Sequence, residues 1–270
     1  MKIRILIGFA ACAALLCAQA PADKGWSILK AAAEDKSAER RGRAMTALAL
    51  VGNNHEARAM AEKGLSDEKE DVRAAAAQTL GRMGSKESIP KLKELAKDSS
   101  FSVVMAATNA LAELNDPAAF AVYYAILTGE KKTGESLGES QMKMLKDPKA
   151  LMKMGFEQGI GFVPFGGVSY QVFKTVTKDD TSPVRAAAAV RLAVDPDPKT
   201  MQALQDTTKD KKWLVRAAVI SSLAKRDDPA ALAVITPLMD DENEVVKLNA
   251  AAAVIRLSAA PGHATSATKK

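Results

Sequence analysis

The sequence predicts an all-α fold, an α-solenoid of about six helical pairs interrupted by an inserted segment rich in glycine and aromatic residues. Three observations predict it. Aromatic residues make up only 4% of a chain that is 47% hydrophobic, so the core consists mainly of Ala, Leu, Val and Met, which suits closely approaching helices. An Asp with a Val five residues later recurs along the chain in five copies that are separated by 31, 81, 31 and 31 residues. A turn signal and a second helical segment follow most of these copies.

The first helix of each repeat is defined by two apolar positions eight residues apart. Apolar residues at i, i+4 and i+8 share one helix face, and the alanines between them allow a neighbouring helix to pack tightly. The repeated Asp residues are Asp67, Asp98, Asp179, Asp210 and Asp241. The paired apolar positions are Val72 and Leu80, Val103 and Leu111, Val184 and Leu192, Val215 and Leu223, and Val246 and Val254.

A second helix follows the first, most clearly after Gly84. There, Pro90 suits a first helical turn, and Leu92 and Leu95 share a face. Asp-Pro pairs at 116–117 and 228–229 are similar signals, because Asp can cap a helix and Pro needs no hydrogen-bond acceptor at the first position. One helical pair cannot bury its apolar face alone, so we expect the pairs to stack.

The segment Asp67–Ser100, DEKEDVRAAAAQTLGRMGSKESIPKLKELAKDSS, resembles a HEAT repeat of the short kind also found in phycobilisome lyases. Weaker copies cover about two-thirds of the chain, and the first, near Arg40 to Gly52, matches only with a one-residue shift. The resemblance implies an armadillo-type α-solenoid and the scaffold or adaptor roles of that family.

A recurrent Arg follows the repeated Asp, at Arg73, Arg185 and Arg216. We interpret both residues as structural: the Asp caps the helix start, and the Arg pairs with it or with the Asp of the adjacent repeat. Val104 and Lys247 stand at the Arg position in the two other copies.

Residues 1–22 have the pattern of a secretory signal peptide. Lys2 and Arg4 precede an uncharged apolar run, and small residues follow, with cleavage expected after Ala22. The sequence therefore predicts an exported, periplasmic bacterial protein. A lipoprotein anchored through Cys17 and an uncleaved N-terminal anchor are the alternatives, although Leu16 before Cys17 argues against lipid modification.

The cysteine content argues against a disulfide-stabilised protein, and the net charge argues against a nucleic-acid-binding protein. Both cysteines lie within residues 1–22, so no disulfide framework is expected in the mature chain. The formal charge of +6 falls to +4 when Lys2 and Arg4 are removed, which gives little electrostatic basis for nucleic-acid binding.

The spacing of 81 residues places an insertion at residues 129–178, between N-terminal repeats at 23–128 and C-terminal repeats at 179–258; residues 259–270 are expected to form a disordered tail. The insertion combines a polar linker, a basic Met-rich helix and an apolar hairpin. It either packs on the repeats, binds a protein partner or contacts a membrane surface with residues 141–175. The candidate contact residues are its regularly spaced lysines and its aromatic residues: Lys143, Lys146, Lys149, Lys153, Phe156, Phe162, Phe165, Tyr170 and Phe173.

No arrangement of residues predicts catalysis. The two histidines, His55 and His263, have no second metal ligand at a recognisable spacing, and neither a GxSxG nor a GxxxxGK[ST] motif occurs. We therefore expect no enzyme activity, no cofactor, no metal and no small-molecule substrate. The predicted function is non-catalytic binding of a protein of unknown identity, with peripheral membrane association and a lyase-like assembly factor as alternatives.

Overall fold

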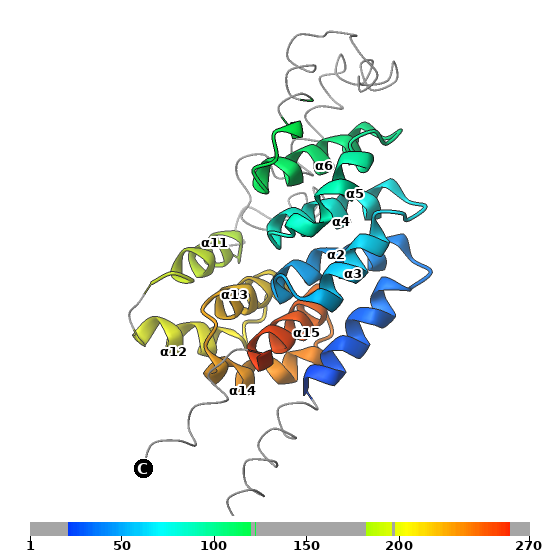
Figure 1. Ribbon diagram of the computed structural model, residues 1–270. Coiled ribbons are helices and arrows are strands. Elements are labelled where there is room, and N and C mark those ends of the chain that lie inside the picture. Colours follow the sequence, from blue (N-terminus) through cyan, green and yellow to red (C-terminus); the bar gives the residue numbers. More distant parts are fainter. Residues whose placement is uncertain (1–20, 120–121, 123–181, 196–197, 260–270) are drawn as a thin grey trace, which may run out of the picture. The chain divides into compact units, whose positions relative to one another are not determined.

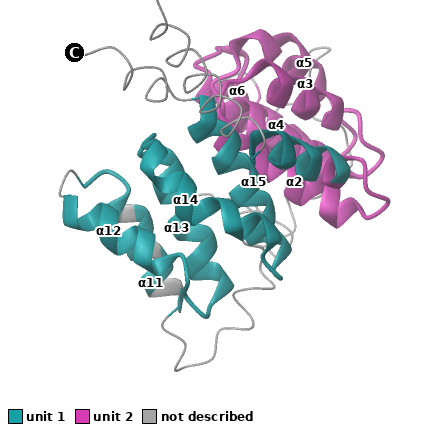
Figure 2. Cartoon of the chain, turned by 90° about the horizontal axis from the view of Figure 1, so that it is seen from below, with its two compact units in different colours: residues 1–31, 181–270 teal, residues 32–180 magenta. Residues whose placement is uncertain are grey.

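The computed structural model describes residues 21–119, 122, 182–195 and 198–259, and every regular element among them is helical (Figure 1). The all-α class and its repeated helical pairs are confirmed. The chain divides into two compact units (Figure 2): unit 1 contains residues 1–31 and 181–270, and unit 2 contains residues 32–180. The predicted insertion at 129–178 lies outside the described residues.

Unit 2 is a stack of helical pairs. Helix α4 is the central first helix and packs against both α2 and α6, while α3 packs against α2 and α4 and α5 packs against α6. The elements are α2 (Ala38–Val51), α3 (His55–Gly64), α4 (Glu70–Arg82), the 3-10 helix η1 (Lys86–Ser88), α5 (Ile89–Leu95) and α6 (Phe101–Glu113).

Unit 1 repeats this arrangement around α13, which packs against α11, α12 and α15. Its C-terminal elements are α11 (Ser182–Leu192), α12 (Pro198–Thr207), α13 (Trp213–Lys225), η2 (Pro229–Ala231), α14 (Leu232–Ile235), η3 (Thr236–Asp240) and α15 (Glu244–Ala259). Residues 21–31 belong to this unit and form most of a helix at 21–33, whereas the sequence analysis groups residues from 23 onward with the N-terminal repeats.

The repeated apolar positions form the core. In α4, α6, α13 and α15, the Val and its partner eight residues later are at most 1% exposed. Leu192, expected in the core, is 36% exposed instead. It is the last residue of α11, and α13 is the main described neighbour of that helix, so its side chain is covered from one side only.

Small residues bring the first helices of neighbouring pairs close together. The hydroxyl of Thr79 donates a hydrogen bond to the backbone oxygen of Met45 at 2.8 Å, and Ser222 donates to that of Ala189 at 2.9 Å. Both hydroxyls occupy the same repeat position, six residues after Arg73 and Arg216. Side-chain to backbone bonds between helices require short side chains at the contact, which is the role of the alanine-rich pattern.

A left-handed residue follows the first helix in four repeats. Gly52 has φ 82°, Gly84 has φ 69°, Asn115 has φ 59° and Asp227 has φ 51°. After Gly84, the N–H of Ser85 donates to the oxygen of Leu80 at 3.1 Å, as in a Schellman motif. Gly, Asn and Asp tolerate positive φ best, which explains their choice at this turn.

The second segment begins where the sequence predicts at Pro90 and at Asp228-Pro229. Pro90 lies in the first turn of α5, and Leu92 and Leu95 are buried. Asp228 caps η2 by accepting a hydrogen bond from the N–H of Ala230 at 2.9 Å, with Pro229 as the first residue. Here the second segment is not one continuous helix, because η2, α14 and η3 follow one another.

Candidate binding surface

All nine sequence-predicted contact residues lie outside the described part of the chain. They are Lys143, Lys146, Lys149, Lys153, Phe156, Phe162, Phe165, Tyr170 and Phe173. The partner or membrane contact at residues 141–175 stays a prediction. Among the described residues, no helix has the length and apolar character needed to cross a bilayer.

In unit 2, the recurrent arginines connect one repeat to the next. The guanidinium of Arg41 donates to both carboxylate oxygens of Asp67, at 2.6 and 2.7 Å. Arg73 binds Asp98 in the same way, at 2.8 and 2.9 Å, and its third nitrogen donates to the backbone oxygen of Asp67 at 2.9 Å. The arginine therefore pairs with the Asp of the adjacent repeat, which is one of the two predicted arrangements.

Unit 1 contains the same bidentate pair between Arg216 and Asp241 and a related pair between Arg185 and Asp210. The predicted helix cap needs correction. Asp210 does not cap α13 directly; it accepts a hydrogen bond from the N–H of Lys212, the residue that precedes the helix, at 2.8 Å. Asp67 accepts from Lys69 in the same way, at 2.9 Å, so the repeated Asp closes an Asx turn before the helix while both of its carboxylate oxygens also accept from Arg41.

These pairs perturb the acidic side chains. The hydrogen bond from Arg41 holds the pKa of Asp67 below its usual value. Burial alone would raise the pKa of Asp98, but the hydrogen bonds from Arg73 and the Ser100 N–H outweigh it and keep that pKa low. Because the charges of these arginines and carboxylates are satisfied by one another, the ladder serves as scaffold and offers no open charged site.

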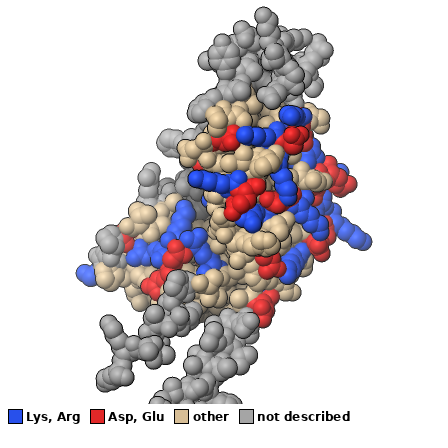
Figure 3. All heavy atoms as spheres, viewed as in Figure 1, with Lys and Arg blue, Asp and Glu red and all other residues tan. Residues whose placement is uncertain are grey.

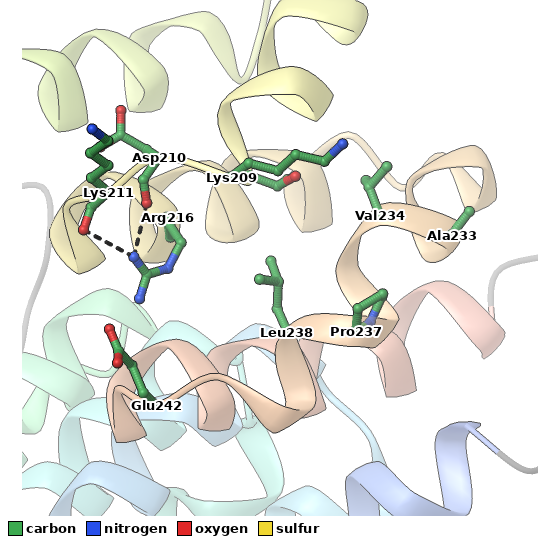
Figure 4. Close-up of a pocket in the computed structure, with 10 residues that line it drawn as sticks. Lys209, Asp210, Lys211, Arg216, Ala233, Val234, Pro237, Leu238 and Glu242 are labelled. Atoms are coloured by element: carbon green, nitrogen blue, oxygen red, sulfur yellow. Dashed lines mark hydrogen bonds between the residues drawn. The ribbon is translucent and has the colours of Figure 1, made fainter.

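A groove in unit 1 is the concavity that we consider as a binding site. It has a volume of about 580 Å³ and lies between the turn that precedes α13 and the segment α14–η3 (Figure 4). Its floor is apolar and its rim is polar. The lining residues are Thr208, Lys209, Asp210, Lys211, Arg216, Ala233, Val234, Pro237, Leu238 and Glu242.

The two rim lysines differ from Arg216 in having no partner. In Figure 4, Leu238 rises from η3 toward the loop that carries Lys209, and Arg216 lies between that loop and Glu242. The guanidinium of Arg216 forms an ion pair with Asp241 and donates hydrogen bonds to the backbone oxygens of Asp210 and Lys211. Lys209 and Lys211 are exposed and form no ion pair with any described residue. In Figure 4, Lys209 extends toward Val234, whereas Lys211 lies at the other end of the groove, beside Arg216.

Sequence reasoning did not single out this groove, although a signal for it exists. Lys209 and Lys211 flank the repeated Asp210, giving Lys-Asp-Lys-Lys. The corresponding stretch around Asp67 is Ser-Asp-Glu-Lys, and around Asp241 it is Asp-Asp-Glu-Asn. Comparison of the repeats would have shown that only the turn at 209–212 combines three lysines with the Asp.

The lining of the groove combines apolar, acidic and basic side chains. Its lining includes neither His nor Cys, the residues that most often supply a nucleophile or a base. Across the described residues, no group of three or more His, Cys, Asp or Glu side chains could hold a metal ion. Acidic and basic side chains intermingle over the face drawn in Figure 3.

One comparison with known proteins identifies a family. A family model described as HEAT repeats matches residues 27–112, 60–131 and 171–255, which together cover more than half of the 270-residue chain. No curated protein matches the chain.

Proposed function

The chain belongs to the HEAT-repeat family, and from this premise we propose that it is an exported, non-catalytic scaffold that holds a partner protein through the groove of unit 1. Repeat proteins of this architecture commonly act by presenting an extended surface to another protein. The family supports protein binding in general, and the groove supplies the specific hypothesis about where it occurs.

The observation that carries the proposal is the combination of an apolar floor with two unpaired lysines. Val234, Pro237 and Leu238 can bury an apolar side chain, and Lys209 and Lys211 can attract carboxylates beside it. A partner segment of complementary chemistry has a Leu, Met or Phe side chain with Asp or Glu nearby.

The expected strength of this contact is modest. Burying one such side chain contributes about 1.5–3 kcal/mol, and each exposed charge pair adds about 0.2–1 kcal/mol. Because association also costs translational and rotational freedom, we expect a single peptide to bind weakly and a whole partner to need further contacts.

A pair of synthetic peptides tests the proposal. One is a fluorescein-labelled acidic peptide with a central Leu-Phe pair, and the other replaces its carboxylates by amides. Fluorescence anisotropy should show binding of the acidic peptide, with Kd at least about tenfold lower than for the amide peptide, and weakening as salt rises. Equal binding of the two peptides would contradict the electrostatic part of the proposal.

A matched pair of variants locates the binding. Lys209→Glu combined with Lys211→Glu reverses both rim charges, whereas Lys36→Glu combined with Lys86→Glu makes the same charge change at exposed positions of unit 2. Only the first variant should lose binding of the acidic peptide. Equal losses would show that the peptide responds to net charge alone.

Export is the second part of the proposal and rests on the signal pattern of residues 1–22. Mass spectrometry of the protein from a periplasmic fraction should give a chain that begins at Asp23. That chain would keep Lys24 and Gly25, which contact η3 and α15 in unit 1. Recovery of the full-length chain from the cytoplasm alone would reject export.

A further inference from the structure

Helix α15 is covered on every side along residues 250–255. Nine of its 16 residues are buried, and they include the four consecutive alanines 250–253. Such consecutive burial means that neighbouring elements cover the helix all round. In the sequence, the residues after α15 are Ala-Pro-Gly-His-Ala-Thr-Ser-Ala-Thr-Lys-Lys, which lack the apolar spacing of a second helix.

The N-terminal helix lies against this helix. A Cβ atom placed on Gly25 would be only 2.8 Å from the backbone oxygen of Ala251 and 3.1 Å from Cγ1 of Ile255. Leu29, one turn later on the same face, is 0% exposed. The ammonium of Lys24 also forms an ion pair of 2.6 Å with Asp240 at the end of η3. Backbone contact, apolar burial and an ion pair thus hold residues 21–31 within unit 1.

We propose that residues 21–31 are the second helix of the last pair of unit 1, and that their seat on α15 and η3 binds this segment even when it is a separate peptide. The last pair is then assembled from two segments that lie far apart in the sequence. This inference does not depend on the groove at Lys209 or on export.

The contacts define what the seat recognises. The position of Gly25 excludes any side chain, because the atom it would meet belongs to the backbone of α15 and cannot rotate away. The next turn buries the apolar residue Leu29, and the residue before the glycine is a cation that pairs with the exposed carboxylate of Asp240. The recognised ligand is therefore a short helix with the pattern Lys-Gly-x-x-x-Leu.

Two substitutions in the intact chain test the seat. Gly25→Leu puts a side chain into the closest contact, whereas Ser27→Leu adds the same side chain at an exposed position of the same helix. Urea unfolding is followed by the fluorescence of Trp26 and Trp213, which both belong to unit 1. The midpoint should fall clearly for Gly25→Leu and stay near that of the parent for Ser27→Leu. Equal midpoints for the two variants would overturn the proposal.

A peptide-exchange experiment tests binding in trans. A specific protease site is inserted after the exposed Lys36 of the full chain, and the protease cuts the chain there. The cut protein is then unfolded in urea and refolded with an excess of a fluorescein-labelled peptide of residues 21–33. The wild-type and Ser27→Leu peptides should co-elute with the chain in size exclusion, and the Gly25→Leu peptide should bind at least tenfold more weakly. A chain that refolds to the parent midpoint with its seat empty would refute the proposal, as would equal binding of the three peptides.

Discussion

Replacing Arg216 by methionine tests whether the Arg–Asp pairs stabilise the stack. The guanidinium donates to both carboxylate oxygens of Asp241, at 2.8 and 2.7 Å, and to the backbone oxygen of Asp210 at 2.8 Å. The side chains of Arg216 and Asp241 are only 9% and 7% exposed. Methionine keeps the apolar stem but leaves a carboxylate that water hardly reaches, and breaking a buried pair costs about 3–5 kcal/mol. Since Asp241 still accepts from the N–H of Asn243 at 2.8 Å, we expect a loss near the lower end, about 3 kcal/mol.

Arg185 provides a matched control at the same position of the preceding repeat. It pairs with Asp210, but its side chain is 44% exposed. Exposed pairs contribute about 0–1 kcal/mol, so Arg185→Met should lower the free energy of unfolding by less than about 1 kcal/mol.

The assay is urea unfolding of both variants, with tryptophan fluorescence reporting on unit 1. Asp241→Asn and the double variant complete a thermodynamic cycle, and the coupling free energy between Arg216 and Asp241 should be about 1.5–2 kcal/mol. If Arg216→Met were no more destabilising than Arg185→Met, burial of the pair would not govern its contribution, and the reasoning would be refuted.

Three further predictions concern unit 2. Gly81→Ala places a Cβ atom 2.8 Å from the Cα of Ala110 and should destabilise the protein by about 1–3 kcal/mol. Gly42→Ala meets no atom within 4 Å and should stabilise the protein by about 0.5–1 kcal/mol. Thermal unfolding followed by circular dichroism compares the two variants, and a shift of the melting temperature in the same direction for both would contradict the packing of α4 on α6. Val72→Asp introduces a charge at a position that is 1% exposed and should cost about 3 kcal/mol or more in urea unfolding, so a neutral result would count against the repeat register. Asp67 and Asp98 have lowered pKa values in the folded state. Their contribution to stability is therefore complete above the unfolded pKa of about 3.9 and is lost as the pH falls through the lower folded values. Urea midpoints measured between about pH 5 and 2 should decline with falling pH, and the decline should be less steep in Asp98→Asn than in the parent.

The repeated helical pairs were predictable because their signals are local. Val72 and Leu80 share a helix face whatever surrounds them, and Pro90 favours a helix start through its own geometry. The pairing of Arg73 with Asp98 was one of two arrangements that the sequence left open. Asp67 lies six residues before Arg73 in the same repeat, whereas Asp98 lies 25 residues after it, at the start of the next repeat. Only the tertiary contacts show which of the two carboxylates the arginine binds.

The left-handed turns and the groove were missed for different reasons. Gly52, Gly84, Asn115 and Asp227 occupy one repeat position, but three residue types share it, so the pattern appears only after the repeats are aligned on Arg41, Arg73, Val104 and Arg216. The groove depends on how η3 places Leu238 near the loop of Lys209, and the broken second segment η2–α14–η3 has no counterpart in the simple two-helix pattern.

The sequence by itself determined the helical class, the 31-residue period and the buried positions, since each follows from spacings within one repeat. Only the tertiary structure decided that residues 21–31 complete unit 1, through a contact between Lys24 and Asp240 that are 216 residues apart. The entropy of closing a loop grows only slowly with its length, so distance along the chain does not prevent such a pairing, and complementary surfaces select it. No periodic pattern records that complementarity, because residues 21–31 lie outside the 31-residue repeat.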